Sequence, residues 1–280
     1  MVSKAKEEVG PWATEKLEAL RKYLDAYTTI LRVQATIRGY HYIDAFAGCS
    51  RWRIKGTEQF IDGSPRVAIS GKHSFDSYTF IELDMERVDQ LRELQTEFPH
   101  LNIRVLQGDA NQRLVHDVAP RIRFDRFQRG VAFLDPYAME LEFTTLQALA
   151  ATRAIEVFVN VPTMALNRDT LRNDPGGISP IAAARMDRFW GSSEWRESFY
   201  EAGSPDLFGN ITDYKIHTTT ARRLGDMYRQ RLREAGFAFV AEQVGVVRNS
   251  TKQPIYCLVF AGPNENGKKI CGKILGVVPH

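Results

Sequence analysis

The first forty residues carry apolar side chains at helical spacing. In the segment PWATEKLEALRKYLDAYTTILRVQ these positions are Leu17, Leu20, Leu24, Tyr27, Ile30 and Leu31. They recur every three or four residues, which is the period of an amphipathic helix. Pro11 stands near the start, where the helix tolerates a proline. The pattern predicts a long N-terminal helix, and we assign residues 1–38 to a helical extension.

From residue 39 onward, short apolar runs alternate with amphipathic segments. The runs HYIDAF, SYTFIEL, NIRVLQG, GVAFLD and IEVFVNV are rich in β-branched and aromatic residues, as strands are. Segments with helical period separate them. Such alternation predicts a parallel sheet with helices on both faces. AGCSRWRIKGTEQFIDGSP is expected to be a loop that leads into a helix, with Ser64 as its N-cap and Pro65 at the first helical position.

The last third of the chain predicts a different arrangement. TTARRLGDMYRQRLREAG has the pattern of a helix, and FAFVAEQVGVV and PIYCLVFAG flank the polar RNSTKQ like the strands of an antiparallel hairpin. Residues from about 163 to 213 are expected to form a helical insertion between the fifth strand and that helix. Its Trp190, Trp195 and Phe199 either line a substrate pocket or form the core of the insertion. We assign residues 39–280 to one domain.

Composition and cysteine spacing exclude several classes of protein. The 280 residues are 44% hydrophobic, but no apolar run is long enough to span a membrane. The N-terminal MVSKAKEEVGPW lacks the apolar core of a signal peptide, so we expect a cytoplasmic protein. Cys49, Cys257 and Cys271 are too far apart for a zinc site or a disulfide framework. No histidine spacing suits a metal, and no catalytic metal is expected.

The net charge of +3 is small, but basic residues gather locally. RIRFDRFQR and ARRLGDMYRQRLR are two such segments, and Arg51, Arg53 and Lys55 form a third. Basic patches of this kind suit a polyanion such as nucleic acid. Solvated helix faces, or acidic partners within the fold, would explain them equally well.

Polar side chains stand at the ends of four predicted strands. The small-residue turn after Asp44 lets the backbone approach a ligand, and Glu82 can accept hydrogen bonds from both ribose hydroxyls. Asp109 either accepts the amino hydrogen of an adenine or simply caps a helix. In a doubly wound sheet, ligands sit at the carboxyl ends of the strands. We therefore expect these side chains to surround one nucleoside.

The fourth strand end, Asp135-Pro136-Tyr137, suggests chemistry on an amine. An exocyclic amine is a poor nucleophile because its lone pair is delocalised into the ring. The Asp135 carboxylate and the Pro136 carbonyl can hold such an amine, and Tyr137 can stack on the base. The alternative is an ordinary strand-end turn.

Taken in order, these strand ends predict a Rossmann-like SAM-methyltransferase fold of class α/β, where SAM is S-adenosylmethionine. We expect a mostly parallel seven-stranded sheet with a C-terminal antiparallel hairpin, an N-terminal helix and a helical insertion. The candidate SAM-binding residues are Asp44, Phe46, Ala47, Gly48, Ser64, Glu82, Leu83, Asp109 and Ala110. The candidate substrate-binding residues are Asn160, Arg168, Arg51 and Arg53. For Asn160 and Arg168, a tied-down loop and a surface salt bridge are the structural alternatives.

Several motifs in register resemble one family. VGPWATEKLEALRKYLDAY, YIDAFAG, DGSPRVAI, FIELD, GDAN, FLDPYAMELEFTTL and NVPTMALNR occur in this order, and the chain from about Gly10 to Arg168 resembles the three-Cys-motif partner protein (TcmP) family. The resemblance implies a class I methyltransferase-like protein with Asp44, Gly48, Glu82, Asp109 and Asp135 at SAM-site and active-site positions. It also implies a partner protein with a three-cysteine motif that looks like a radical-SAM iron–sulfur enzyme.

Three functions follow from these features. The first is a SAM-dependent methyltransferase that acts on an amino group of a nucleic acid base, with the basic segments on phosphates. The second is a methyltransferase of a small molecule or a protein. The third is a non-catalytic module that holds SAM or an adenosine product for its iron–sulfur partner. Cys49, where a second glycine is usual, and the single Pro136 favour this third function.

Overall fold

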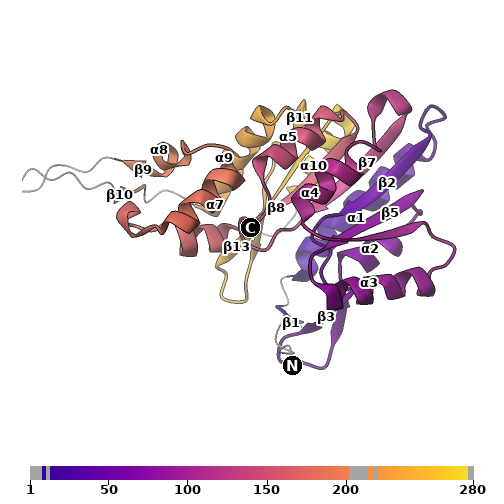
Figure 1. The fold of residues 1–280 in the computed structure, drawn as a ribbon, viewed down its shortest axis with the longest axis horizontal. Helices are drawn as coiled ribbons and strands as arrows, with labels where there is room; N and C mark the ends of the chain where they lie inside the picture. Colours follow the sequence, from indigo (N-terminus) through magenta and orange to yellow (C-terminus); the bar gives the residue numbers. More distant parts are fainter. Residues whose placement is uncertain (1–7, 11–12, 202–213, 217–219, 277–280) are drawn as a thin grey trace, which may run out of the picture.

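The computed structural model describes residues 8–10, 13–201, 214–216 and 220–276, with an eight-stranded sheet at its centre (Figure 1). The strands of this sheet are β2 (Gly39–Asp44), β5 (Ser77–Glu82), β6 (Ile103–Gln107), β7 (Gln128–Leu134), β8 (Ile155–Val161), β11 (Phe239–Val240), β12 (Gly245–Arg248) and β13 (Pro254–Gly262). Their order is β6-β5-β2-β7-β8-β13-β11, and β12 also pairs with β13. The first five run parallel and β13 runs antiparallel to β8. The predicted Rossmann-like fold is confirmed, and the two-residue β11 brings the sheet from seven strands to eight.

Strand order reverses at β2, which lies between β5 and β7. After β2 the chain forms β5 and β6 on one side of β2, and it then returns to form β7 and β8 on the other side of β2. A crevice forms outside the carboxyl ends of the strands at such a reversal, and α/β proteins place their ligands there. The ends of β2, β5 and β7 are therefore the part of the sheet where a ligand site is expected.

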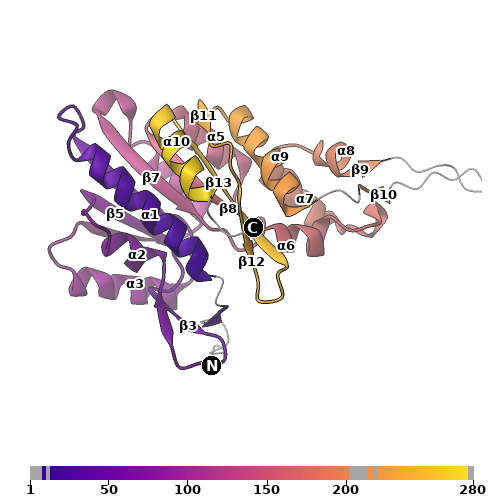
Figure 2. The same ribbon diagram turned by 180° about the vertical axis from the view of Figure 1, so that it is seen from behind.

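Two layers of helices cover the sheet. One face carries α1 (Ala13–Leu31), α2 (Ser64–Ile69), α3 (Met85–Glu97) and α10 (Glu265–Leu275), and Figure 2 shows α1 and α10 lying across it. The other face carries α4 (Ala110–Arg113), a π-helical turn η2 (Leu114–Val118), α5 (Phe143–Ala151), α7 (Pro180–Trp190) and α9 (Ala221–Glu234). Side chains alternate between the two cores along β7, as a pleated strand requires: Val131 and Phe133 face the α1 layer, and Ala132 and Leu134 the α5 layer.

The segment predicted as a loop after β2 contains a β-hairpin instead. β3 (Arg51–Ile54) and β4 (Phe60–Asp62) pair antiparallel, and β1 (Glu8–Val9) joins β3 in parallel. The side chain of Trp52 packs over the backbone of Gly48. Both strands are short and largely exposed, so they lack the apolar run from which strands are recognised. The hairpin projects beyond the carboxyl edge of the sheet, as does the turn between β12 and β13 (Figures 1 and 2).

The predicted N-cap of α2 is wrong by one residue. Gly63 holds the N-cap position without a side-chain bond, and Ser64 is the first helical residue, followed by Pro65. The Ser64 side chain lies against the carboxyl group of Asp44, so it is used for a tertiary contact and not for capping.

Between β8 and α9 the chain forms short elements that extend to one side of the sheet (Figure 1). They are α6 (Thr163–Ala165), the π-helical turn η4 (Leu166–Thr170), the 3-10 turn η5 (Pro175–Gly177), α7, α8 (Trp195–Phe199), β9 (Tyr200–Glu201) and β10 (Tyr214–Lys215). Another 3-10 turn, η3 (Phe124–Arg126), precedes β7. Trp190, Trp195 and Phe199 are buried in this region, and Trp190 packs edge-on against Phe199 and Tyr228. These aromatic residues form a core, which is the second of the two alternatives that the sequence left open for them.

Candidate active site at the carboxyl edge

The glycine turn after β2 and the acid at the end of β5 come together as the sequence predicts. Gly48 has a positive φ of 60°, and its amide donates to Glu82 Oε2 at 2.8 Å. The other oxygen, Oε1, accepts the amides of Leu83 and Asp84, each at 2.9 Å. Glu82 therefore joins the ends of two neighbouring strands. Because each carboxylate oxygen has two lone pairs, Glu82 keeps acceptor capacity for a ligand hydroxyl.

The predicted SAM-binding residues around this turn share one edge of the sheet. Ala47 is buried and its amide donates to the carbonyl of Ile81. Phe46 is half-buried against the α5-side core. Leu83 is 66% exposed directly after Glu82, so it offers an apolar face beside the acid.

Asp109 follows the end of β6 and caps α4, accepting the amide of Gln112 at 3.0 Å. The carboxylate is exposed, and the capping alternative is therefore observed, while Ala110 beneath it is buried. Burial raises the pKa of Glu140; the charge of Arg185 opposes this rise, and the charges of Asp109 and Glu82 add to it. Glu140 is therefore close enough to Asp109 and Glu82 for their charges to interact. Three carboxylates thus surround the ends of β5 and β6.

Asn111 fixes the segment after β7 that carries the fourth predicted strand-end motif. Its amide nitrogen donates to the Glu140 carbonyl at 2.8 Å, and its oxygen accepts the Glu142 amide at 2.9 Å. The Thr145 hydroxyl donates to the same oxygen. The loop after Asp135 is therefore held against α4, and a site there does not depend on a free loop.

Asp135 lies in a cluster of polar side chains brought from four elements. Its Oδ2 accepts Lys16 Nζ of α1 at 2.5 Å, and its Oδ1 accepts Asn160 Nδ2 of β8 at 2.5 Å. The ammonium of Lys16 also lies 5.2 Å from the ring centre of Tyr256 on β13. Burial lowers the pKa of Lys16, but Asp135, Tyr256 and Asp44 together outweigh burial and the pKa is raised. Lys16 therefore stays protonated in this setting.

Asp44 stands at the end of β2, close enough to Asp135 for their charges to interact. It is fully buried, and burial raises its pKa to about 7. Asp135 adds to this rise, while Ser64, Tyr42 and Lys16 oppose it. Tyr42 donates its hydroxyl to Asp44 Oδ2 at 3.1 Å. At neutral pH the carboxyl of Asp44 lies near its midpoint of ionisation.

Three buried acceptors at this edge have no hydrogen-bond partner within the described residues: Asp44 Oδ1, Asn160 Oδ1 and Thr163 Oγ1. All three side chains are at most 1% exposed. They belong to the ends of β2 and β8 and to the start of α6. Buried polar atoms are nearly always paired, and an unpaired acceptor favours a ligand that brings a donor.

The remaining predicted residues lie outside this cluster. Pro136 is buried beside Asp135, while Tyr137 is 80% exposed. Arg168 lies on η4, pairs with Asp169 at 2.5 Å and is near enough to Tyr137 for their charges to interact. Arg51 and Arg53 lie on the hairpin, with Arg51 3.6 Å from Asp62 and Arg53 3.7 Å from Glu58. The ion pair of Arg168 matches the surface-salt-bridge alternative.

The sequence did not reveal Lys16 as part of this site. Its signal was a lysine within the apolar stripe of the N-terminal helix, four residues before Leu20 and seven before the buried Tyr23. Residues with that spacing lie on one face of a helix. That face packs on the sheet, so Lys16 was the one charged side chain aimed inward near the start of α1.

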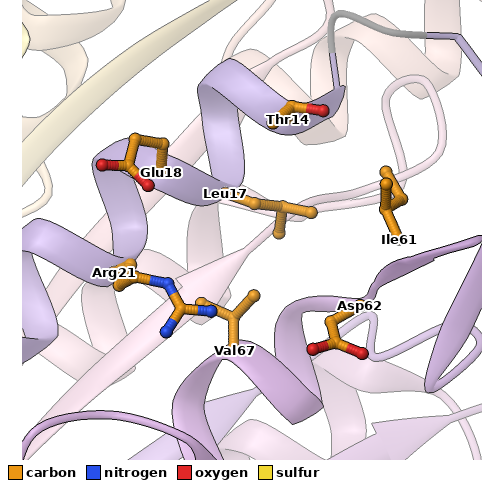
Figure 3. A pocket seen from close by; sticks show the side chains of 7 residues that line it. All are labelled: Thr14, Leu17, Glu18, Arg21, Ile61, Asp62 and Val67. Carbon is orange, nitrogen blue, oxygen red and sulfur yellow. The ribbon is translucent and has the colours of Figure 1, made fainter.

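A separate small pocket lies between α1, α2 and β4. Figure 3 shows its lining: Thr14, Leu17, Glu18 and Arg21 of α1, Ile61 and Asp62 of β4, and Val67 of α2. Its volume is about 130 Å³, below the roughly 300–1,000 Å³ of ligand pockets. This pocket is too small for a nucleoside and is not the site that the strand ends form.

Two features are missing from the residues that the structure describes. Within that part of the chain, no helix combines the length and the apolar character needed to cross a membrane. Across the same residues, no three histidine, cysteine, aspartate or glutamate side chains gather in a way that would hold a metal ion. The cysteines at 49, 257 and 271 are buried and free of disulfides.

The chain resembles known structures in fold and not in sequence. No protein-family model matches it, and no curated protein matches it. The Legionella pneumophila protein LPL1258, described with the family model DUF519, is 13% identical, with 95% of this chain and 92% of that chain covered and a TM-score of 0.50. The N-terminal domain of EvdMO1, solved with SAH bound, is 9% identical over 86% of this chain and 80% of that chain, with a TM-score of 0.38. The first likeness agrees with the fold assigned from strand order, and the TcmP resemblance stays a prediction.

Proposed function

We propose that this chain is a SAM-dependent methyltransferase that acts on an amino group of a nucleic acid base. The observation that carries the proposal is the set of buried acceptors without partners, Asp44 Oδ1, Asn160 Oδ1 and Thr163 Oγ1, around Asp135. They lie at the carboxyl edge of a sheet whose strand order reverses at β2. Amines and ammonium groups are the donors that such acceptors need, and both SAM and an exocyclic base amine supply them.

The residues at this edge fit SAM. Glu82 would accept one ribose hydroxyl on the single lone pair, on Oε2, that its three backbone bonds leave free. Leu83, exposed beside it, would contact the flat adenine, and Asp109 at the tip of α4 would face its amino group. The turn from Asp44 to Gly48 would lie along the methionine part. A negative edge of this kind favours a ligand that carries a positive sulfonium.

SAM supplies the methyl group: the lone pair of the target nitrogen forms the new N–C bond, the C–S bond electrons go to sulfur, and the nitrogen then releases one proton to solvent water. Asp135 holds the amine through a hydrogen bond and draws its lone pair out of the ring. The carbonyl of Pro136 offers a second acceptor. Tyr137, 80% exposed, is free to stack on the base. Lys16, which is charged, is not the group that receives the proton.

Nucleic acid would be held by basic side chains near the same edge. Arg51 and Arg53 sit on a hairpin that projects beyond the sheet (Figure 2), and their ion pairs are long and exposed. Such pairs contribute little stability, so phosphates can replace the carboxylates. The arginines from Arg121 to Arg129 precede or begin β7, at the opposite edge, and are not part of this surface.

Two features favour a second candidate, the non-catalytic partner of a three-Cys-motif iron–sulfur protein. Asp135 already binds Lys16 and Asn160, and Cys49 fills a position in the turn where a second glycine is usual. A protein that only holds SAM or an adenosine product would not need a free acceptor at Asp135.

The test is calorimetric titration with SAM and SAH (S-adenosylhomocysteine), followed by transfer of a tritiated methyl group to DNA, RNA and protein. Replacing Glu82 by Gln is expected to weaken SAH binding roughly 10-fold or more, since a charge-assisted bond is lost. Glu86→Gln, in the exposed first turn of α3, is the control and should bind as the wild type does. Equal affinities of all three proteins would contradict the assignment of the ribose site.

Asp135→Ala separates the two candidates. A methyltransferase with this variant should lose transfer by roughly 100-fold or more, while its affinity for SAH stays within about twofold. Undiminished transfer would remove Asp135 from the chemistry. SAH binding without transfer to any acceptor by the wild type would favour the binding partner.

A further inference from the structure

The ion pair between Lys16 and Asp135 is built by the fold and not by a mobile surface chain. Their side chains are 12% and 22% exposed, and the residues are 119 positions apart in the sequence. Helix α1 is fixed farther along by Tyr23, whose hydroxyl donates to the buried Glu156 of β8. Because Lys16 and Tyr23 lie on one face of α1, anchoring Tyr23 also delivers the ammonium to the end of β7.

Asp135 has a specific set of charged and titratable neighbours. Lys16 approaches it from α1, Asp44 and Tyr42 from β2, and Tyr256 from β13, and Tyr137 follows two residues later. Of these, Lys16 is the positive group, and Asp44 is the second carboxylate. Two buried carboxylates at close range resist joint ionisation. Lys16, whose ammonium lies 2.5 Å from Asp135 Oδ2, is the positive charge that opposes this effect.

We propose that Lys16 is a positioning residue that keeps Asp135 ionised and oriented toward the target amine, an inference that rests on the methyltransferase function. Lys16 and Asn160 each take one lone pair on opposite oxygens of Asp135. Each oxygen keeps a second lone pair for the amine. With both oxygens tied, the carboxylate plane cannot rotate, so the remaining lone pairs have fixed directions. The amine hydrogens then meet an acceptor that is already aligned.

The matched variants are Lys16→Met, Lys16→Arg and Lys22→Met. Methionine keeps most of the lysine stem and removes its charge, whereas arginine keeps the charge. Lys22 is on the same helix, but its side chain is 54% exposed and pairs with Glu18 at 3.4 Å. Loss of this surface pair should have little effect, which makes Lys22→Met the control for removing a lysine from α1.

The first measurement is kcat and KM for methyl transfer as a function of pH. Lys16→Met should lower kcat roughly 100-fold near neutral pH with little change in KM, and the acid limb of the profile should move to higher pH. Lys16→Arg should restore a large part of kcat, and Lys22→Met should match the wild type. A lowered kcat with an unmoved acid limb would mean that Lys16 is merely structural, and the proposal would be wrong.

The second measurement needs no catalysis: ¹³C NMR titration of the aspartate carboxyls in the protein without substrate. In Lys16→Met the coupled titration of Asp44 and Asp135 should move up by about one pH unit or more relative to Lys22→Met. If it moves while no variant transfers methyl groups, the role of Lys16 stands and the methyltransferase function falls. If it does not move, the role of Lys16 falls whatever the activity.

Discussion

Two groups of buried carboxyls lie beneath α1, and they differ in how well they are paired. The anchor cluster consists of Glu156, Tyr23 and Asn264: Tyr23 donates to one carboxylate oxygen and Asn264 to the other. The edge cluster consists of Asp44, Asp135, Lys16 and Asn160. Both oxygens of Asp135 are bonded there, but Asp44 and Asn160 each keep a buried oxygen without a partner. Within the described residues, both oxygens of the Glu156 carboxyl are paired, although the nearby Tyr27 hydroxyl is not, whereas the edge cluster keeps two unpaired acceptors.

The degree of pairing separates a structural cluster from a functional one better than the pKa does. Burial raises the pKa of Glu156 to about 7 and that of Asp44 to about 7. Shifted pKa values therefore occur in both clusters, although such shifts often mark active sites. Glu156 begins β8 at the amino edge of the sheet, whereas Asp44 ends β2 at the carboxyl edge. Unpaired acceptors and the location at the ligand edge together single out the edge cluster.

The largest expected effect is on the pH dependence of stability and involves Glu156→Gln. The pKa of Glu156 rises from its ordinary 4.5 to about 7 on folding, so protonation favours the folded state. This stabilisation is complete below the unfolded pKa and is lost as pH rises through the folded value. Glutamine does not titrate. The variant should therefore gain stability relative to the wild type as pH increases, by about 1.4 kcal/mol per unit and about 3 kcal/mol in total.

Urea unfolding of both proteins at several pH values between these limits measures this difference. The contribution of Asp44 is common to both proteins and cancels. A difference that stays constant with pH would show that Glu156 keeps its ordinary pKa. The carboxyls of Glu156 and Asp44 would then no longer share a raised pKa, and the two clusters would differ in their ionisation at neutral pH.

The next effect tests how tightly the anchor cluster is packed, and it compares two glycines of α10. A Cβ on Gly267 would lie 2.6 Å from Glu156 Oε1, whereas a Cβ on Gly272 meets nothing within 4 Å. Gly267→Ala should therefore lower the free energy of unfolding by about 1–3 kcal/mol. Gly272→Ala should raise it by up to about 1 kcal/mol, because alanine is the better helix former.

Denaturant unfolding at one pH is sufficient for this pair. Equal changes for the two variants would mean that α10 does not press on the cluster. Gly267→Ala should leave SAH affinity unchanged, since the anchor cluster lies away from the carboxyl edge.

The fold was predictable because β5, β7 and β8 are almost fully buried and their sequences are nearly continuous apolar runs. The missing elements have other patterns. The hairpin strands β3 and β4 are only four and three residues long, and each of their side chains is either exposed or only half-buried. Helix α10 starts with the polar ENGKK, and its apolar positions Ile270, Cys271, Ile274 and Leu275 are confined to its second half. Short or half-polar elements are fixed by the surface they pack on, which the sequence does not display.

The candidate site was predictable where it follows from strand ends. Asp44, Glu82, Asp135 and Asn160 do lie at one edge, because parallel strands bring their carboxyl ends together. Lys16 was not foreseen because its role depends on how α1 lies across the sheet. Glu156 was also missed, although a carboxylate within the apolar run IEVFVNV was itself a signal of a buried polar cluster.

The smallest change in stability is expected from the edge cluster, in a comparison of two asparagines. Asn160→Ala removes one hydrogen bond to Asp135 but also removes a buried oxygen that has no partner. The two effects oppose each other, so the free energy of unfolding should change by less than about 1 kcal/mol. Asn264→Ala should lower it by about 2 kcal/mol, because Asn264 both caps α10 through Gly267 and binds Glu156.

Function should rank the two asparagines in the opposite order. Asn160→Ala should reduce methyl transfer roughly 10-fold, since Asp135 loses one of its two restraints, while Asn264→Ala should transfer methyl groups at the wild-type rate when folded. Unfolding curves and transfer rates of the two variants, measured side by side, check both rankings. A large loss of stability in Asn160→Ala would mean that the edge cluster is as complete as the anchor cluster. Its unpaired acceptors would then no longer indicate a ligand.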